Sequence, residues 1–153
     1  MIRAEWNALR TPSKRMMQEQ VAPALRRLGF KGSGQTFTLP SDTHWALIGF
    51  QKSVWGDSNE LRFTVNLTVV GKHAWESARV ERPYLGARPA ANTSYGFPTW
   101  RQRIGFLLPE RLDLWWPVVA GSSTESAAEE VIAAIRDYAL PEMNIQLEGA
   151  PDA

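Results

Sequence analysis

The sequence predicts an α+β domain: a single antiparallel sheet of about five strands, with an N-terminal and a C-terminal helix packed on one face. Apolar residues recur at helical spacing near both ends of the chain, and between residues 36 and 118 the apolar period changes to two. Helices at both ends of a run of strands are typical of this architecture. At 153 residues the chain has the size of one domain.

We therefore expect a single domain over residues 1–153, with its core at about 11–145 and a frayed end at 146–153. Hydrophobic residues make up 44% and charged residues 22% of the chain, which excludes wholesale disorder. The net charge of +1 gives no general preference for nucleic acid. There is no cysteine, and no apolar run has the length of a membrane span, so we expect a cytoplasmic protein without disulfides.

The first helix is expected over Thr11–Gly29. Thr11 suits the N-cap, Pro12 the first helical position and Gly29 the left-handed C-terminal stop. Pro23 lies inside the pattern and removes one backbone donor, so it should kink the helix. One apolar stripe runs along this segment: Met17, Val21, Ala24, Leu25 and Leu28.

The period of two predicts strands joined by turns. Turn-forming residues at Gly56–Asn59 connect the two longest segments, and Pro109–Arg111 connect the last two into a second hairpin. Gly32-Ser33-Gly34 is interpreted as a turn between the helix and the first strand. The expected strands are Thr36–Leu39, Trp45–Val54, Leu61–Val70, Trp100–Leu108 and Leu112–Val118.

Residues 73–99 have no steady period and are expected to form a long excursion, with one helical turn near His73–Ala78. Beyond the strands, Ser122 and Glu125 have the spacing of a capping box. The helix that follows should end before Pro141. Its expected apolar face consists of Ala128, Val131, Ile132, Ile135, Tyr138 and Ala139.

Strand alternation also predicts a candidate site. If Leu61, Phe63, Val65 and Leu67 face the helices, polar and aromatic side chains gather on the other face, where Gly49 and Gly105 leave room above the backbone. Such a platform suits an anionic, planar or peptide ligand, although a solvated face or a face covered by a second copy of the chain would have the same pattern. The candidate ligand-binding residues are Gln51, Arg62, Asn66, Arg101, Arg103 and Trp115.

No catalytic residue is nominated, because the sequence has no nucleophile motif and no glycine-rich phosphate loop. His73 and Glu76 have the spacing of two metal ligands on one helical turn, but without a third ligand we expect neither a metal site nor a cofactor. His44 is expected at the edge of the sheet.

Three function classes remain open. We favour a non-enzymatic binding protein whose ligand is a peptide or protein. An enzyme acting on an anionic substrate held by Arg101 and Arg103 is the alternative. Single-strand nucleic-acid binding is a third, and the near-zero net charge counts against it.

Short motifs along about residues 11–145 resemble the bacterial family called domain of unknown function 4304. The resemblance implies a fold and a bacterial source, and it supplies no activity and no catalytic residues. Its order of helix, strands, insertion, strands and helix is also similar to that of small secretion chaperones and some immunity proteins, by analogy of fold alone. The motifs that carry it are Leu25-Arg26-Arg27-Leu28-Gly29-Phe30-Lys31, Thr36-Phe37, Phe50-Gln51-Lys52-Ser53, Val65-Asn66-Leu67, Arg101-Gln102-Arg103-Ile104-Gly105, Asp113-Leu114-Trp115-Trp116 and Ala139-Leu140-Pro141.

Overall fold

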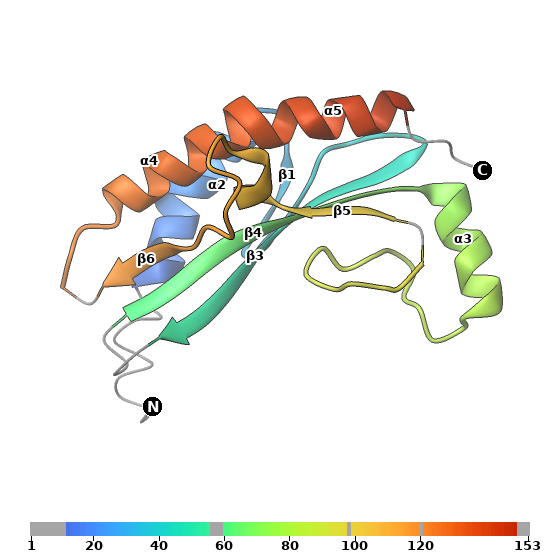
Figure 1. Cartoon of the computed structure of the whole chain (residues 1–153), viewed down its shortest axis with the longest axis horizontal. Coiled ribbons are helices and arrows are strands. Elements are labelled where there is room, and N and C mark those ends of the chain that lie inside the picture. Colours follow the sequence, from blue (N-terminus) through green and yellow to red (C-terminus); the bar gives the residue numbers. More distant parts are fainter. Residues whose placement is uncertain (1–11, 56–59, 98, 120, 150–153) are drawn as a thin grey trace.

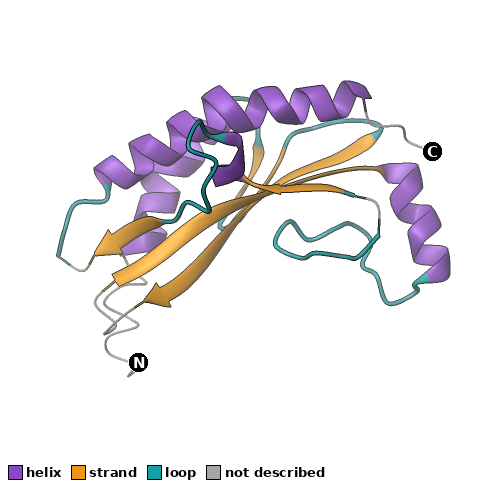
Figure 2. Ribbon diagram, in the orientation of Figure 1, coloured by secondary structure: helices purple, strands orange, loops and turns teal. Residues whose placement is uncertain are grey.

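The computed structural model describes residues 12–55, 60–97, 99–119 and 121–149, in which a six-stranded antiparallel sheet carries the terminal helices on one face (Figure 1, Figure 2). The predicted α+β class is confirmed. Strands β1 to β5 pair in chain order, and β6 also pairs with β4. The predicted cap at Thr11 and the turn at Gly56–Asn59 lie outside the described residues. The strands are β1 (Lys31–Ser33), β2 (Thr36–Thr38), β3 (His44–Trp55), β4 (Glu60–Gly71), β5 (Trp100–Arg103) and β6 (Trp116–Val119).

The helix-packed face of β4 is the one that its alternation predicts. Leu61, Phe63, Val65 and Leu67 are buried to 1% exposure or less and belong to the main core. Their neighbours on β3, including Phe50, lie in the same cluster. Alternate residues of the two long strands therefore face away from the helices, and this helix-free face carries the candidate site.

The N-terminal helix contains a π-helical turn that ends two residues before Pro23. Residues 12–27 are helical, with η1 (Met17–Val21) preceding α2 (Ala22–Arg27), and Pro23 is the second residue of α2. The Ala22 N–H donates to the Met17 carbonyl, an i→i−5 bond. The wider turn accommodates the proline, whose ring would clash with the i−4 carbonyl of a regular α-helix. Gly29 ends the helix with φ 104°, as predicted.

The C-terminal helix also has a π-turn before a proline, and the predicted end of this helix is wrong. It runs from α4 (Glu125–Ala134) through the π-turn η3 (Ile135–Ala139) into α5 (Leu140–Gly149), so it does not end before Pro141. Of the end expected to fray, residues 146–149 are helical, and 150–153 lie outside the described residues. Pro141 is the second residue of α5. It follows Leu140, whose N–H donates to the Ile135 carbonyl. None of the helices in the described segments has both the length and the apolar character needed to cross a membrane.

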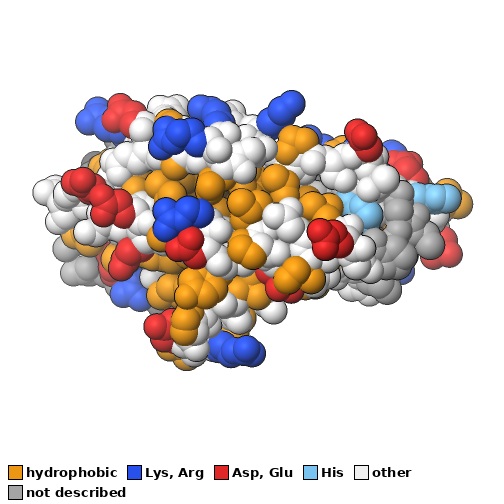
Figure 3. All heavy atoms as spheres, turned by 90° about the horizontal axis from the view of Figure 1, so that it is seen from above, with side chains coloured by type: hydrophobic (Ala, Val, Ile, Leu, Met, Phe, Trp, Pro, Cys, Tyr) orange, Lys and Arg blue, Asp and Glu red, His pale blue; other side chains and the backbone are white. Residues whose placement is uncertain are grey.

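Two details of this helix also differ from the prediction. Helix α4 begins at Glu125, whose N–H donates to Ser123 Oγ, so the capping box of Ser122 and Glu125 does not form. Tyr138 is 39% exposed, because the π-turn adds a residue and rotates it away from the buried side of the helix. Figure 3 looks onto this helix layer and shows apolar side chains between scattered charges.

The predicted hairpin of the last two strands is wrong. Strand β5 stops at Arg103, and residues Ile104–Leu107 form the 3-10 helix η2. Strands β5 and β6 instead pair with different halves of β4, at Asn66–Val69 and Glu60–Phe63. The chain between them passes so close to Gly105 that a Cβ there would collide with the Leu112 carbonyl, which explains why the period of two breaks at this point.

The excursion after β4 is more ordered than predicted. Helix α3 spans Lys72–Glu81, well beyond one turn, and the loop after it folds beneath the helix-free face of the sheet (Figure 1). Trp75 is fully buried in a second apolar cluster and donates its indole N–H to the Gly86 carbonyl at 3.0 Å. The segment Gly32–Ser33, expected as a turn, instead belongs to β1, which pairs with β2.

Candidate functional site

Four predicted site residues lie together on the helix-free face. In the sheet register Asn66 of β4 is opposite Gly49 of β3 on one side and Arg103 of β5 on the other. The Asn66 Nδ2 group donates to Gln51 Oε1 at 2.9 Å, and Arg103 donates to Gln51 Oε1 at 3.2 Å and to Asn66 Oδ1 at 3.3 Å. The Arg103 guanidinium also lies 5.3 Å from the centre of the Trp115 ring.

Two residues that the prediction did not include complete this arrangement. Asp113 accepts a hydrogen bond from Arg103 at 2.9 Å, and Asn92 of the excursion accepts one from Asn66 Nδ2 at 2.8 Å. The Asn92 amide in turn donates to the Phe50 carbonyl at 3.2 Å. We call Gln51, Asn66, Asn92, Arg103 and Asp113 the Arg103 network. Its hydrogen bonds tie the excursion and the segment before β6 to the sheet.

Arg62 and Arg101, the other two predicted site residues, do not belong to the Arg103 network. Arg62 lies further along β4, opposite Ser53, and forms an ion pair with Glu60 at 3.2 Å. Arg101 borders the network and donates to the Asn92 carbonyl at 3.4 Å, but among the described residues it forms no ion pair. Burial, and secondarily the charge of Arg103, lower the pKa of Arg101 below its ordinary value.

The room expected above the two glycines is filled by the chain itself. A Cβ at Gly49 would lie 2.5 Å from Asn92 Oδ1 and 2.8 Å from the Ala91 Cβ. Gly105 is covered by the backbone of residues 112 and 114. Both glycines thus permit close approach of a loop to the sheet, and neither forms the floor of an open site.

We expect Gly49→Ala to lower the free energy of unfolding by about 1–3 kcal/mol, the usual cost of overpacking, because Asn92 would have to move off the sheet. Urea denaturation measures this change. Gly86→Ala is the matched control, since a Cβ at Gly86 would find its nearest heavy atom at 3.6 Å. Equal losses in the two variants would contradict the close approach of Asn92.

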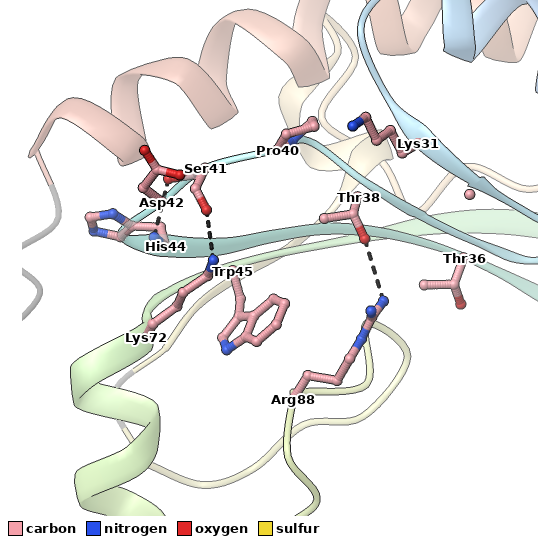
Figure 4. A pocket seen from close by; sticks show the side chains of 11 residues that line it. Lys31, Thr36, Thr38, Pro40, Ser41, Asp42, His44, Trp45, Lys72 and Arg88 are labelled. Atoms are coloured by element: carbon pink, nitrogen blue, oxygen red, sulfur yellow. Dashed lines mark hydrogen bonds between the residues drawn. The ribbon is translucent and has the colours of Figure 1, made fainter.

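A hollow of about 430 Å³ is lined by residues of β1, β2, the start of β3, the start of α3 and the excursion (Figure 4). We call it the Trp45 hollow. Its lining includes three cationic side chains from three separate elements: Lys31 of β1, Lys72 of α3 and Arg88 of the excursion. Asp42 is the one carboxylate among its lining residues in the described part of the chain.

Trp45 positions two of these cations. Lys72 Nζ lies 4.8 Å and the Arg88 guanidinium 5.5 Å from the centre of the indole ring, and Figure 4 shows the ring between them. Lys72 Nζ also donates to the Ser41 carbonyl at 2.7 Å, and Arg88 donates to Thr38 Oγ1 at 3.4 Å. Both charged groups are therefore held at the hollow by the fold.

Lys72 lies at the positive end of a helix dipole. It is the first residue of α3, which has no acidic residue in its first turn and no side-chain cap. The helix dipole places partial positive charge at this end, where a cation destabilises and an anion stabilises by about 0.3–1 kcal/mol. An anionic ligand in the hollow would relieve both the dipole and the clustered cations.

The two histidines lie on different elements, His44 on β3 and His73 on α3. His44, the first residue of β3, lies beyond the residues that pair with β2; it is 6% exposed, pairs with Gly71 and has Nδ1 2.7 Å from Thr43 Oγ1. Glu76 forms an ion pair with Arg79 at 3.1 Å. Within the ranges that the structure describes, no three histidine or acidic side chains converge.

A family model described as "Domain of unknown function (DUF4304)" matches residues 21–144, a range that contains the whole Arg103 network and the Trp45 hollow. The chain belongs to this family. The resemblance of the short motifs is thereby confirmed. The searches of curated proteins and of solved structures found no significant match to this DUF4304 chain.

Strand alternation brought together Gln51, Asn66, Arg103 and Trp115 of the DUF4304 domain. Asp113 shares the alternation of Trp115 and could have been included on that basis. Asn92 and Arg88 lie in a loop without a period, and no sequence pattern places them against the sheet. The Trp45 hollow depends on that loop, and for this reason it could not be predicted.

Proposed function

We propose that this DUF4304 chain is a cytoplasmic binding protein whose ligand is an acidic segment of a peptide or protein partner. The observation that carries the proposal is that Lys31, Lys72 and Arg88 line one hollow whose described lining contains a single carboxylate, Asp42. Cations held beside an aromatic ring, as Lys72 and Arg88 are at Trp45, favour an anionic ligand.

The size and the lining of the Trp45 hollow favour side chains of a peptide. Its volume of about 430 Å³ suits one or two acidic side chains. Thr36 and Thr38 place hydroxyl-bearing side chains along the lining, and hydroxyl groups can donate to carboxylate oxygens. The Arg103 network supports the binding role by holding the excursion, and with it Arg88, against the sheet.

The same geometry argues against stacked bases. A base stacks on a free ring face, whereas Lys72 and Arg88 already lie over the Trp45 ring. An anionic enzyme substrate clamped by Arg101 and Arg103 is also less favoured, because Arg103 is held by Asp113, Asn66 and Gln51.

We expect Arg88→Ala and Lys72→Ala each to weaken binding of an acidic peptide by about 10-fold or more, the value of one charge-assisted hydrogen bond. The probe is a decamer of glutamate, titrated by calorimetry at low salt. Lys14→Ala is the matched control, since Lys14 is an exposed cation in the helix on the other side of the sheet. Binding should be unchanged in that variant.

A decamer of thymidine nucleotides tests the nucleic-acid alternative at nearly the same charge. The proposal requires the glutamate decamer to bind more tightly. Tighter binding of the oligonucleotide, or equal affinity of the wild-type and Arg88→Ala proteins for the glutamate decamer, would contradict it.

A further inference from the structure

We infer that the Trp45 hollow recognises a phosphate monoester in its dianionic form. This inference rests on the binding function proposed above and identifies the acidic group. The same chemistry is supplied by a phosphorylated side chain of a peptide or by a small phosphorylated metabolite, and the experiment below separates these sources.

The charge of the hollow is the first argument. Three cationic residues, Lys31, Lys72 and Arg88, and one carboxylate, Asp42, are among the described lining residues, which leaves an excess of two positive charges along the lining. A phosphate monoester carries about −1.5 to −2 charge at pH 7, whereas one carboxylate carries −1. Only the phosphate neutralises the excess with a single group of side-chain size.

The donor groups are the second argument. Lys72 Nζ has three N–H donors and uses one on the Ser41 carbonyl, and Arg88 uses one of its five on Thr38. Ser41 Oγ accepts the backbone N–H groups of Thr43 at 3.3 Å and His44 at 3.1 Å. Ser41 Oγ also lies 3.5 Å from Thr43 Oγ1, which can accept its proton, so the donors left for a ligand are those of Lys72 and Arg88. A phosphate has three acceptor oxygens for this donor set, and a carboxylate has two.

The rigidity of the cations is the third argument. Trp45 lies between Lys72 and Arg88, and Lys72 lies at the N-terminus of the ten-residue helix α3 (Figure 4). The helix dipole adds partial positive charge on the same side of the hollow as Lys72. Charges that are positioned before the ligand arrives lose less side-chain entropy on binding, which favours a compact dianion.

Three peptides of one sequence test the inference by calorimetry. They carry at the same central position phosphoserine, serine O-sulfate or glutamate. The sulfate has the shape of the phosphate with a single charge, so it separates charge from geometry. We expect the phosphopeptide to bind at least about 10-fold more tightly than either of the others.

Two variants locate the binding. Lys72→Met keeps the apolar stem against Trp45 and removes the charge, and Arg88→Gln shortens and neutralises the second cation. Each should remove most of the preference for phosphate, while Lys14→Ala leaves it unchanged; thermal unfolding shows that each variant is folded. Retention of the preference in both variants would overturn the inference.

The outcomes also separate this inference from the proposed function. Equal affinities for the three peptides would overturn the phosphate inference and leave acidic-peptide binding intact. Absence of binding by all three, and by the glutamate decamer, would overturn both. N-acetyl-O-phosphoserine amide identifies the source: affinity equal to that of the phosphopeptide favours a metabolite, and affinity at least about 10-fold weaker favours a phosphorylated partner.

Discussion

Phe63→Ala is expected to lower the free energy of unfolding by about 3–5 kcal/mol, the largest loss that we predict. Phe63 is 1% exposed at the middle of the helix-packed face. Its ring stacks on Trp116 of β6 with centres 5.7 Å apart and lies 6.2 Å from the ring of Phe50 on β3. Removing the ring leaves a cavity where three strands meet the helix layer, and close-packed neighbours relax into it only in part.

Chemical denaturation followed by circular dichroism measures this loss. Tyr84→Ala is the control, because Tyr84 is also aromatic but 81% exposed, and its truncation should change stability by less than about 0.5 kcal/mol. A loss below about 1 kcal/mol for Phe63→Ala would mean that the assignment of the two sheet faces is reversed.

The faces of the sheet could be predicted because a strand has a strict period of two. Leu61, Phe63, Val65 and Leu67 are apolar while Arg62, Thr64 and Asn66 between them are polar, and a shift of one residue would place the polar set against the helices. The long strand β3 pairs with β4, so the faces of β3 follow from those of β4. The architecture of the domain therefore depends on a signal that is local in sequence.

The ends of the elements were less predictable, for reasons that are equally physical. A proline such as Pro141 ends a regular α-helix, but a preceding π-turn removes the clash of its ring with the helix. The residue types of η3 do not indicate that turn. The end of β5 at Arg103 depends on contact between Gly105 and a segment seven residues later. Both are effects of the folded chain on local structure.

The candidate site, like the fold, could be predicted where strands supply its residues and not where a loop does. Side chains on the long strands were placed on the correct face, whereas Asn92 and Arg88 reach the sheet from a loop held by the buried Trp75. A loop contributes no period, so its contacts are determined by packing of the second apolar cluster. The sequence consequently identifies the polar face without indicating where that face is hollow.

Arg103→Ala is expected to lower the free energy of unfolding by about 2–4 kcal/mol. The variant removes hydrogen bonds from Arg103 to Gln51, Asn66 and Asp113, at 3.2, 3.3 and 2.9 Å. Asn66 is fully buried, so its Oδ1 atom would lose its donor away from bulk water. Each buried polar group left unsatisfied costs about 1–3 kcal/mol.

Arg101→Ala is the matched control, since Arg101 lies two residues earlier on the same strand and the same face. Arg101 donates a long hydrogen bond, 3.4 Å, to the Asn92 carbonyl. Burial lowers the pKa of Arg101, which means that its charged form is disfavoured where it lies. Truncation should therefore cost less than about 1 kcal/mol.

The pair of variants also decides whether the predicted platform itself binds ligand. If Arg103 contacts the ligand, Arg103→Ala should weaken binding of the glutamate decamer by about 1.5–3 kcal/mol while the midpoint of urea unfolding stays the same. If Arg103 stabilises the fold, as its internal hydrogen bonds favour, the midpoint of urea unfolding should fall.

Arg103→Lys separates the effect of charge from that of geometry, because lysine keeps the positive charge and loses the planar fork that joins Asp113 to Asn66. Stability that stays low in this variant assigns the role to geometry, whereas restored stability would assign it to charge alone.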